Sequence, residues 1–327
     1  MLATPKDQAS ELRLLMASRQ TAAPPQQPPV RRPHRPTRQP ALPPLPSARM
    51  RMTAVPTHSP ARRSARVIAV ASGKGGVGKT NIAVNLAIIL AGRGHRVVLV
   101  DADLGTANVD VVMNVRSRFD LSHLLRGQRT IDEITTLIAP RLRLVAGASG
   151  LASVADLSPL DRQELVRELG RLEERADIIL LDCAAGISQN VLAFTQSVDQ
   201  LLIVTTPEPT ALTDAYALVK VLTRAPWTPP MGLIVNQSKT IREGQLVAQR
   251  VATVADRFLN ASLASTGHVV SDHHVALAVR QRVPFVVKYP RCPAATCIAA
   301  LAAKVNQSSA NRTTSPGFFG RVLSFFY

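Results

Sequence analysis

The sequence predicts a doubly wound α/β fold with a mainly parallel sheet flanked by helices, preceded by a disordered N-terminal arm. Short β-branched apolar runs alternate with helical stretches from residue 66 to about residue 304. This alternation is typical of a buried parallel sheet. A glycine-rich loop joins the first run to the first helix, and polar residues follow three later runs. In such sheets, ligands bind at the carboxyl ends of the strands.

Composition divides the 327 residues into four parts. Residues 1–19 have the spacing of a short amphipathic helix. Residues 20–65 are rich in proline and arginine and contain neither glycine nor an aromatic residue, which predicts a disordered linker. We expect the folded domain at residues 66–305, and a flexible tail with a phenylalanine-rich amphipathic helix at residues 306–327.

Apolar runs predict the strands and helices of the domain in order, and glycine and proline residues mark where these elements begin or end. A helix that ends at Gly92 follows the loop, and Ser158-Pro159 opens another with an N-cap and an early proline. The expected strands are residues 66–71, 96–100, 142–145, 177–181, 200–204, 231–235 and 263 to about 269.

Bulk properties exclude several classes of protein. The net charge is +17, but much of the basic excess lies in residues 1–66, where Asp7 and Glu11 are the only acidic residues. No apolar run approaches the ~18 residues of a membrane-spanning helix, and the N-terminus lacks signal-peptide order. Three cysteines make no disulfide framework and suit a reducing cytosol.

The glycine-rich loop fits the phosphate-binding pattern G-x-x-x-x-G-K-[ST]. Small residues let successive N–H groups curl around phosphate oxygens, and the following helix adds its positive end. The lysine would reach the β- and γ-phosphates of a nucleoside triphosphate, and the threonine hydroxyl would bind Mg²⁺. The loop consists of Gly73, Lys74, Gly75, Gly76, Val77, Gly78, Lys79 and Thr80.

Polar side chains end three strands on the same rim as this loop. Asp101, Asp182 and Asn236 each follow an apolar run, and Asp103 lies two residues beyond the first of them. Phosphoryl transfer to water needs a metal ion, cations for the developing charge and a group that orients the water. Asp182 has the Walker B arrangement, in which the acid holds Mg²⁺ through water. Helix capping and turn formation are the alternative roles of these residues.

The run Lys74-Gly75-Gly76-Val77-Gly78-Lys79-Thr80 resembles the deviant Walker A box of the MinD/ParA ATPases. In that family the first lysine reaches the phosphates bound by a partner subunit, so the resemblance implies an ATP-bound homodimer. It also implies that Asp103 orients the attacking water and that Asp101 supports the site. Gly186 would approach the γ-phosphate, and Asn236 would read adenine.

Two further stretches resemble the FlhG branch of this family, the regulators of flagellar number: residues 101–110 and residues 205–216. The N-terminal segment is similar to that branch's D-Q-A-x-x-L-R element, which stimulates the FlhF-type GTPase. Flagellar C-ring proteins and a flagellar transcription regulator are further implied partners. The matching residues of the activator element are Asp7, Gln8, Ala9, Leu12 and Arg13.

The last ten residues concentrate four of the eight phenylalanines. A short helix of this composition can lie in a membrane interface, as the comparable C-terminal helix of MinD-type ATPases does. We therefore expect a cytoplasmic protein that associates reversibly and weakly with the inner face of the cell membrane. The alternative is that the helix docks on the protein's own core or on a partner. The expected membrane-facing residues are Phe318, Phe319, Val322, Leu323, Phe325 and Phe326.

The sequence leaves two other functions open beside an ATP-driven flagellar switch. One is a positioning or partitioning ATPase that acts on DNA or another cargo, although a basic arm in place of a basic folded face weakens that interpretation. The other is an iron–sulfur carrier. The spacing of Cys292 and Cys297 disfavours it, and packing is the simpler role of these thiols.

Overall fold

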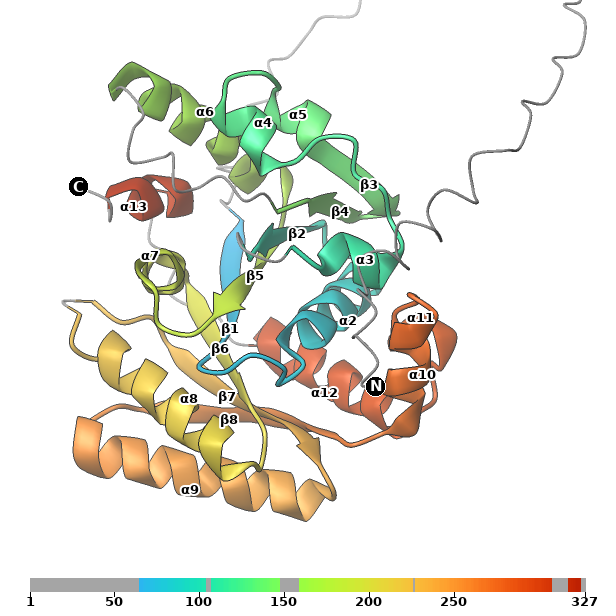
Figure 1. Ribbon diagram of the computed structural model, residues 1–327, viewed down its shortest axis with the longest axis vertical. Helices are drawn as coiled ribbons and strands as arrows, with labels where there is room; N and C mark the ends of the chain where they lie inside the picture. The colour runs from blue at the N-terminus through green and yellow to red at the C-terminus, as the bar shows by residue number, and fades with distance from the viewer. Residues whose placement is uncertain (1–64, 104–106, 148–158, 226, 308–316, 325–327) are drawn as a thin grey trace, which may run out of the picture. The chain divides into compact units, whose positions relative to one another are not determined.

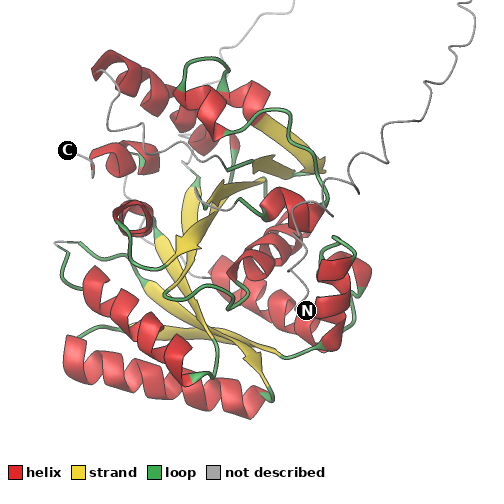
Figure 2. Cartoon of the chain, viewed as in Figure 1, coloured by secondary structure: helices red, strands yellow, loops and turns green. Residues whose placement is uncertain are grey.

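A mainly parallel sheet forms the centre of the folded domain, as the computed structural model shows (Figures 1 and 2). The structure describes residues 65–103, 107–147, 159–225, 227–307 and 317–324, with the side chains of residues 125, 159–165 and 323 left out. The eight strands of this part are β1 (Arg66–Ser72), β2 (Val97–Ala102), β3 (Thr135–Ala139), β4 (Leu142–Val145), β5 (Ile178–Ala185), β6 (Gln200–Thr205), β7 (Met231–Ser238) and β8 (Leu263–Val270).

The strand order is β3-β4-β2-β5-β1-β6-β7-β8. The chain forms β2, β3 and β4 on one side of β1, returns to place β5 between β2 and β1, and then adds β6, β7 and β8 on the other side. All neighbouring strands pair in parallel except β3 and β4. Every residue of β1 and β2 is buried. Runs of this kind were recognisable as strands because a parallel sheet covered on both faces needs apolar residues throughout. The predicted doubly wound fold is confirmed.

Helices cover both faces of the sheet, and two apolar clusters separate them from it. One cluster includes residues of α4 (Leu121–Leu125), α5 (Ile131–Ile134), α6 (Pro159–Arg175), α7 (Gln189–Ser197), α8 (Pro209–Leu222), α9 (Ile241–Leu259) and α13 (Phe318–Ser324). The other includes residues of α2 (Lys79–Gly92), α3 (Val109–Met113), α10 (His273–Arg280), α11 (Phe285–Lys288) and α12 (Pro293–Gln307).

Three strands end two or more residues later than the sequence predicts. β2 reaches Ala102, β5 reaches Ala185 and β7 reaches Ser238. Asp101, Asp182 and Asn236 therefore lie inside their strands, because backbone pairing with a neighbour continues whatever the side chain is: Asp101 pairs with Asp182 across β2 and β5. The prediction that polar residues mark the strand ends is wrong by a few residues.

One strand was not predicted at all. β3 forms an antiparallel hairpin with β4 across Pro140 and Arg141, and Arg141 adopts a left-handed φ of 67°. Left-handed backbone at a hairpin turn favours glycine or asparagine, so an arginine there gives no turn signal. The N-cap at Ser158, the activator element at residues 1–19 and the linker at residues 20–65 lie outside the described residues, apart from Ala65.

The C-terminal helix α13 lies against the core, in contact with α6 and α7 (Figure 1). Phe318, Phe319 and Val322 are 1%, 5% and 5% exposed, and the Phe318 ring stacks on Phe194 of α7 with 6.5 Å between centroids. These three side chains therefore do not face a membrane in this conformation, which is the docked alternative that the sequence left open. The Leu323 side chain and residues Phe325 and Phe326 lie outside the described part.

Polar contacts fix the docked helix. The Arg321 guanidinium donates from Nε and Nη2 to the Ser197 carbonyl, at 2.9 and 2.7 Å, and lies 3.5 Å from the Asp199 carboxylate. Asp199 also accepts the backbone N–H of Val67 in β1 at 2.8 Å. Among the residues that the structure describes, none of the helices combines the length and apolar character that a bilayer crossing needs.

Docking of α13 predicts a difference between two phenylalanines. Phe318→Ala should lower the free energy of unfolding by about 2 kcal/mol or more, because it removes a buried ring. Phe258→Ala, at a ring of α9 that is 65% exposed, should cost less than about 0.5 kcal/mol. Urea denaturation followed by circular dichroism measures both values, and equal effects would contradict the docked position.

Candidate functional site

The phosphate loop lies between β1 and α2 at the carboxyl edge of the sheet (Figure 1). Gly76 and Gly78 have φ values of 81° and 87°, in the left-handed region that side chains rarely adopt. A Cβ at Gly78 would also clash with the Asn236 side chain, and one at Gly73 would clash with the backbone carbonyl of Asp214. Both steric and conformational limits therefore demand glycine in this loop.

Lys79 and Asp182 form a buried ion pair at the centre of the site. The Lys79 Nζ lies 2.7 Å from Oδ1 of Asp182, and the two side chains are 8% and 2% exposed. Thr80 also hydrogen bonds to this carboxylate. Burial raises the pKa of Asp182, while the charge and hydrogen bonds of Lys79 and Thr80 oppose that rise. The structure thus brings together the predicted Walker A lysine, threonine and Walker B acid.

Asp101 organises the loop that follows β2. Its Oδ1 accepts the N–H of Asp103 at 3.1 Å, and its Oδ2 accepts those of Asn108 and Val109 at 3.0 and 3.2 Å. Burial raises the pKa of Asp101 to about 6, because the side chain is only 1% exposed and the charge of Asp182 adds to the effect. Asp101 therefore fixes the backbone at Asp103, and its supporting role at a bound nucleotide stays a prediction.

The other predicted nucleotide residues also gather here. Gly186 adopts a φ of 98°, and its N–H donates to the Ser72 carbonyl at 2.8 Å, which ties the end of β5 to the phosphate loop. Asn236 is buried, and its Nδ2 donates to the Val77 carbonyl at 2.7 Å. The structure thus gives Asn236 a contact that holds the loop, and its adenine-reading role stays a prediction.

Lys74 turns away from its own loop. Its Nζ lies 2.8 Å from Glu208 Oε1 and 2.7 Å from Thr210 Oγ1, at the start of α8, and its side chain is 36% exposed. The hydrogen bond and charge of Lys74 lower the pKa of Glu208. Sequence reasoning missed Glu208 and Thr210 as partners, although both lie in the stretch that resembles the FlhG branch. An acid 134 positions away gives no local signal of such a contact.

The thiol beside the Walker B acid has no nucleophilic character. Cys183 follows Asp182 in β5 and is fully buried, and burial raises its pKa to about 12. The three cysteines are free, with Cys292 also buried and Cys297 partly exposed.

The oxygen ligands of the site suit Mg²⁺. The Thr80 hydroxyl and the Asp182 carboxylate meet where a bound phosphate chain would lie.

Comparison with known proteins agrees with this geometry. A family model described as an AAA domain matches residues 65–226. The antiactivator FleN of Pseudomonas aeruginosa is 37% identical over 241 residues, which cover 74% of this chain and 86% of FleN. The chain belongs to the MinD/ParA family of ATPases, in the branch that contains FleN. It is therefore an ATPase of the deviant Walker A type.

Other relatives support the same placement. The flagellum site-determining protein YlxH of Helicobacter pylori is 39% identical over 193 residues, or 58% of this chain and 64% of YlxH. The structure of the cell division ATPase MinD of Pyrococcus furiosus superposes with a TM-score of 0.61 at 25% identity, covering 74% of this chain and 98% of that one. MinD of Pyrococcus horikoshii, complexed with Mg-ADP, gives the same TM-score and identity.

The raised pKa of Asp101 predicts how the stability of this ATPase depends on pH. The folded protein holds a proton on Asp101 up to about pH 6, whereas the unfolded chain releases it near the ordinary value of 3.8. Stability from this group is full below about pH 4 and is lost as the pH rises through 6, by about 3 kcal/mol in total.

Asp101→Asn removes that dependence. Urea denaturation between pH 4 and 7 should show the wild type losing up to about 3 kcal/mol relative to the variant. The variant also loses acceptor capacity toward Asn108 and Val109, but that cost does not change with pH. Parallel curves for the two proteins would contradict the raised pKa.

Proposed function

We propose that this ATPase is a switch that dimerises with ATP and is reset by hydrolysis. The observation that carries the proposal is the position of Lys74, which the structure directs to Glu208 and Thr210 and away from its own phosphate loop. Lys79 already supplies the loop's buried cation. A second lysine at the rim is free of that task and can serve the phosphates of another subunit, as the family resemblance implies.

Hydrolysis then follows from groups on one rim. Lys79 and the loop N–H groups bind the phosphates and offset the charge that develops on them. Thr80 and Asp182 would hold Mg²⁺, which would offset negative charge on the phosphates when bound. Asp103 orients the attacking water, and Asp101 fixes the backbone from which Asp103 projects.

Size-exclusion chromatography with ATP and Mg²⁺ tests the switch. We expect the wild type to double its apparent mass with ATP and to return with ADP. Asp103→Ala should remain a dimer, because loss of the water-orienting group slows hydrolysis by about 100-fold or more. Lys79→Ala and Lys74→Ala should remain monomers, the first without bound nucleotide and the second with it.

Lys220→Ala is the matched control, since Lys220 is an exposed lysine at the far end of α8 from Glu208. It should dimerise as the wild type does. Circular dichroism must show that Lys79→Ala is folded, because it leaves the buried Asp182 without its cation. If the apparent masses of the wild type and of Asp103→Ala are indifferent to nucleotide, the switch is refuted.

The relatives suggest what the switch controls. FleN is named as an antiactivator and YlxH as a flagellum site-determining protein. We therefore assign this chain to the regulation of flagellar number and placement. Its output toward an FlhF-type GTPase would run through Asp7, Gln8 and the rest of the activator element, which lies outside the described residues. C-ring proteins and a flagellar transcription regulator are the other partners in this proposal.

A peptide of residues 1–20 tests this output. It should raise the GTP hydrolysis rate of an FlhF-type GTPase. Gln8→Ala should abolish the increase, because the resemblance places Gln8 in the D-Q-A run of the activator element. Gln20→Ala in the same peptide is the control and should leave the stimulation intact. A peptide without effect, together with steeply salt-dependent DNA binding by the ATP-bound protein, would favour the DNA-partitioning alternative instead.

The proposal also includes membrane contact, which requires that the C-terminal helix first leaves its docked position. The protein would bind the inner face of the cell membrane weakly and reversibly through its C-terminal helix. Phe318, Phe319 and Val322 are buried in the docked helix, so α13 must leave α6 and α7 before these side chains can enter a lipid interface. Two helices on one dimer would bind a membrane more tightly than a single helix does.

A further inference from the structure

A cluster of polar side chains lies beyond the end of β8, apart from the phosphate loop. Asp272 caps the N-terminus of α10, where its Oδ1 accepts the N–H of His274 at 3.0 Å. Its Oδ2 accepts the N–H of Ala294, in the first turn of α12, at 3.1 Å. One carboxylate thus joins the end of β8 to two helices, and its side chain is only 3% exposed.

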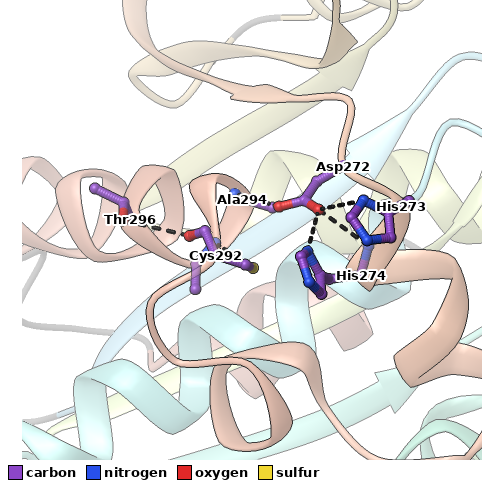
Figure 3. Close-up of polar contacts among 7 residues, drawn as sticks. Asp272, His273, His274, Cys292, Ala294 and Thr296 are labelled. Atoms are coloured by element: carbon purple, nitrogen blue, oxygen red, sulfur yellow. Dashed lines mark hydrogen bonds and ion pairs between the residues drawn. The ribbon is translucent and has the colours of Figure 1, made fainter.

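Two imidazole rings converge on the same carboxylate oxygen (Figure 3). Nδ1 of His274 lies 2.8 Å from Asp272 Oδ1, and Nδ1 of His273 lies 3.8 Å from it. One ligand atom from each of the three residues falls within 4.8 Å of the other two. The rings also lie close together, with centroids 3.9 Å apart. Such convergence is what a metal ion requires of its ligands.

Helix capping alone does not account for this arrangement. A cap needs only the carboxylate and a backbone N–H, and Asp272 already has two such donors. The His273 side chain is 76% exposed and could turn its polar edge to water, yet it lies against the His274 ring, tilted by 37°, with Nδ1 toward the carboxylate. The Tyr289 ring supports His274 from beside it, at 4.7 Å between centroids.

We propose that Asp272, His273 and His274 bind a divalent transition-metal ion, with Zn²⁺ as the best fit. Metal–ligand bonds of ~2.0–2.1 Å at tetrahedral angles place ligand atoms ~3.3 Å apart. The two observed Nδ1–Oδ1 distances, 2.8 and 3.8 Å, bracket that separation. Imidazole nitrogens select Zn²⁺ and similar ions over Mg²⁺, which prefers oxygen ligands. The exposed side of His273 leaves a position for water or an exogenous ligand.

The surroundings prepare the carboxylate for this role. The Asp272 carboxylate accepts hydrogen bonds from the N–H groups of His274 and Ala294 and from the Cys292 thiol. Hydrogen bonds to Oδ2 and from the Cys292 thiol fix its orientation, which is the usual support of ligating carboxylates.

The position of the cluster connects it with the nucleotide edge. Ser271, next to Asp272, donates its N–H to the carbonyl of Ser238 at 2.8 Å, two residues beyond Asn236 in β7. Asp272 joins the start of α10 to α12 through its hydrogen bond from Ala294, and the bound ion would use no residue of the phosphate loop. This site is thus a second, separate cation site in the chain.

Calorimetric titration of Zn²⁺ into the full-length chain tests the proposal, after treatment with a chelator and without nucleotide or Mg²⁺. We expect one saturable site per chain. His273→Asn and His274→Asn should each weaken binding by about 10-fold or more, and the double variant should abolish it. An asparagine amide at position 274 can still donate to Asp272, so the cap and the fold are preserved.

His123→Asn is the matched control. His123 lies beside Asp120 at the start of α4 with the same Nδ1–Oδ1 distance of 2.8 Å, but no second histidine of the described residues joins them in such a group. This variant should bind Zn²⁺ as the wild type does. Co²⁺ in place of Zn²⁺ should give the visible absorption of a tetrahedral site in the wild type and lose it in His274→Asn. Binding that survives in the double variant, or no saturable binding at all, overturns the proposal.

Discussion

The buried ion pair between Lys79 and Asp182 is the interaction on which the site depends. Two charges with side chains 8% and 2% exposed are stable only as partners, since either one left alone would carry a large desolvation cost. The pair therefore links the first turn of α2 to β5 and sets the distance between the phosphate loop and the Walker B acid. The glycines of the loop supply the backbone conformation that this short distance requires.

Negative charge exceeds positive charge around that pair. Asp101 pairs in register with Asp182 across neighbouring strands, and Asp103 also acts on Asp182 electrostatically. Backbone N–H groups stabilise Asp101, yet its pKa still rises to about 6 because burial and the neighbouring acid outweigh them. A site built in this way gains from a divalent cation and opposes the approach of phosphates without one. Lys79 and a cation held by Thr80 and Asp182 would therefore both be needed to offset the negative charge of bound phosphates.

Much of this site could be predicted from the sequence because its residues are local. Each strand that carries a functional side chain is a short apolar run, and Gly73–Thr80 is one contiguous stretch, so pattern and spacing suffice. The ends of β5 and β7 could not be predicted, since pairing partners decide them. Glu208 could not be assigned to Lys74 because tertiary packing alone brings the two together. Asp272-His273-His274 looks like an ordinary helix cap until the ring positions are known.

The C-terminal helix illustrates the limit of composition as a guide. Phenylalanines at helical spacing fit a membrane interface and a protein core equally well, because both remove apolar surface from water. Contacts of Arg321 with Ser197 and Asp199 hold the helix against the protein core in this conformation. The same rings cannot be buried in both places, so any membrane affinity is reduced by the free energy of undocking α13. Since α7 starts three residues after Gly186 and ends where Arg321 binds, one helix separates the nucleotide rim from the docked tail.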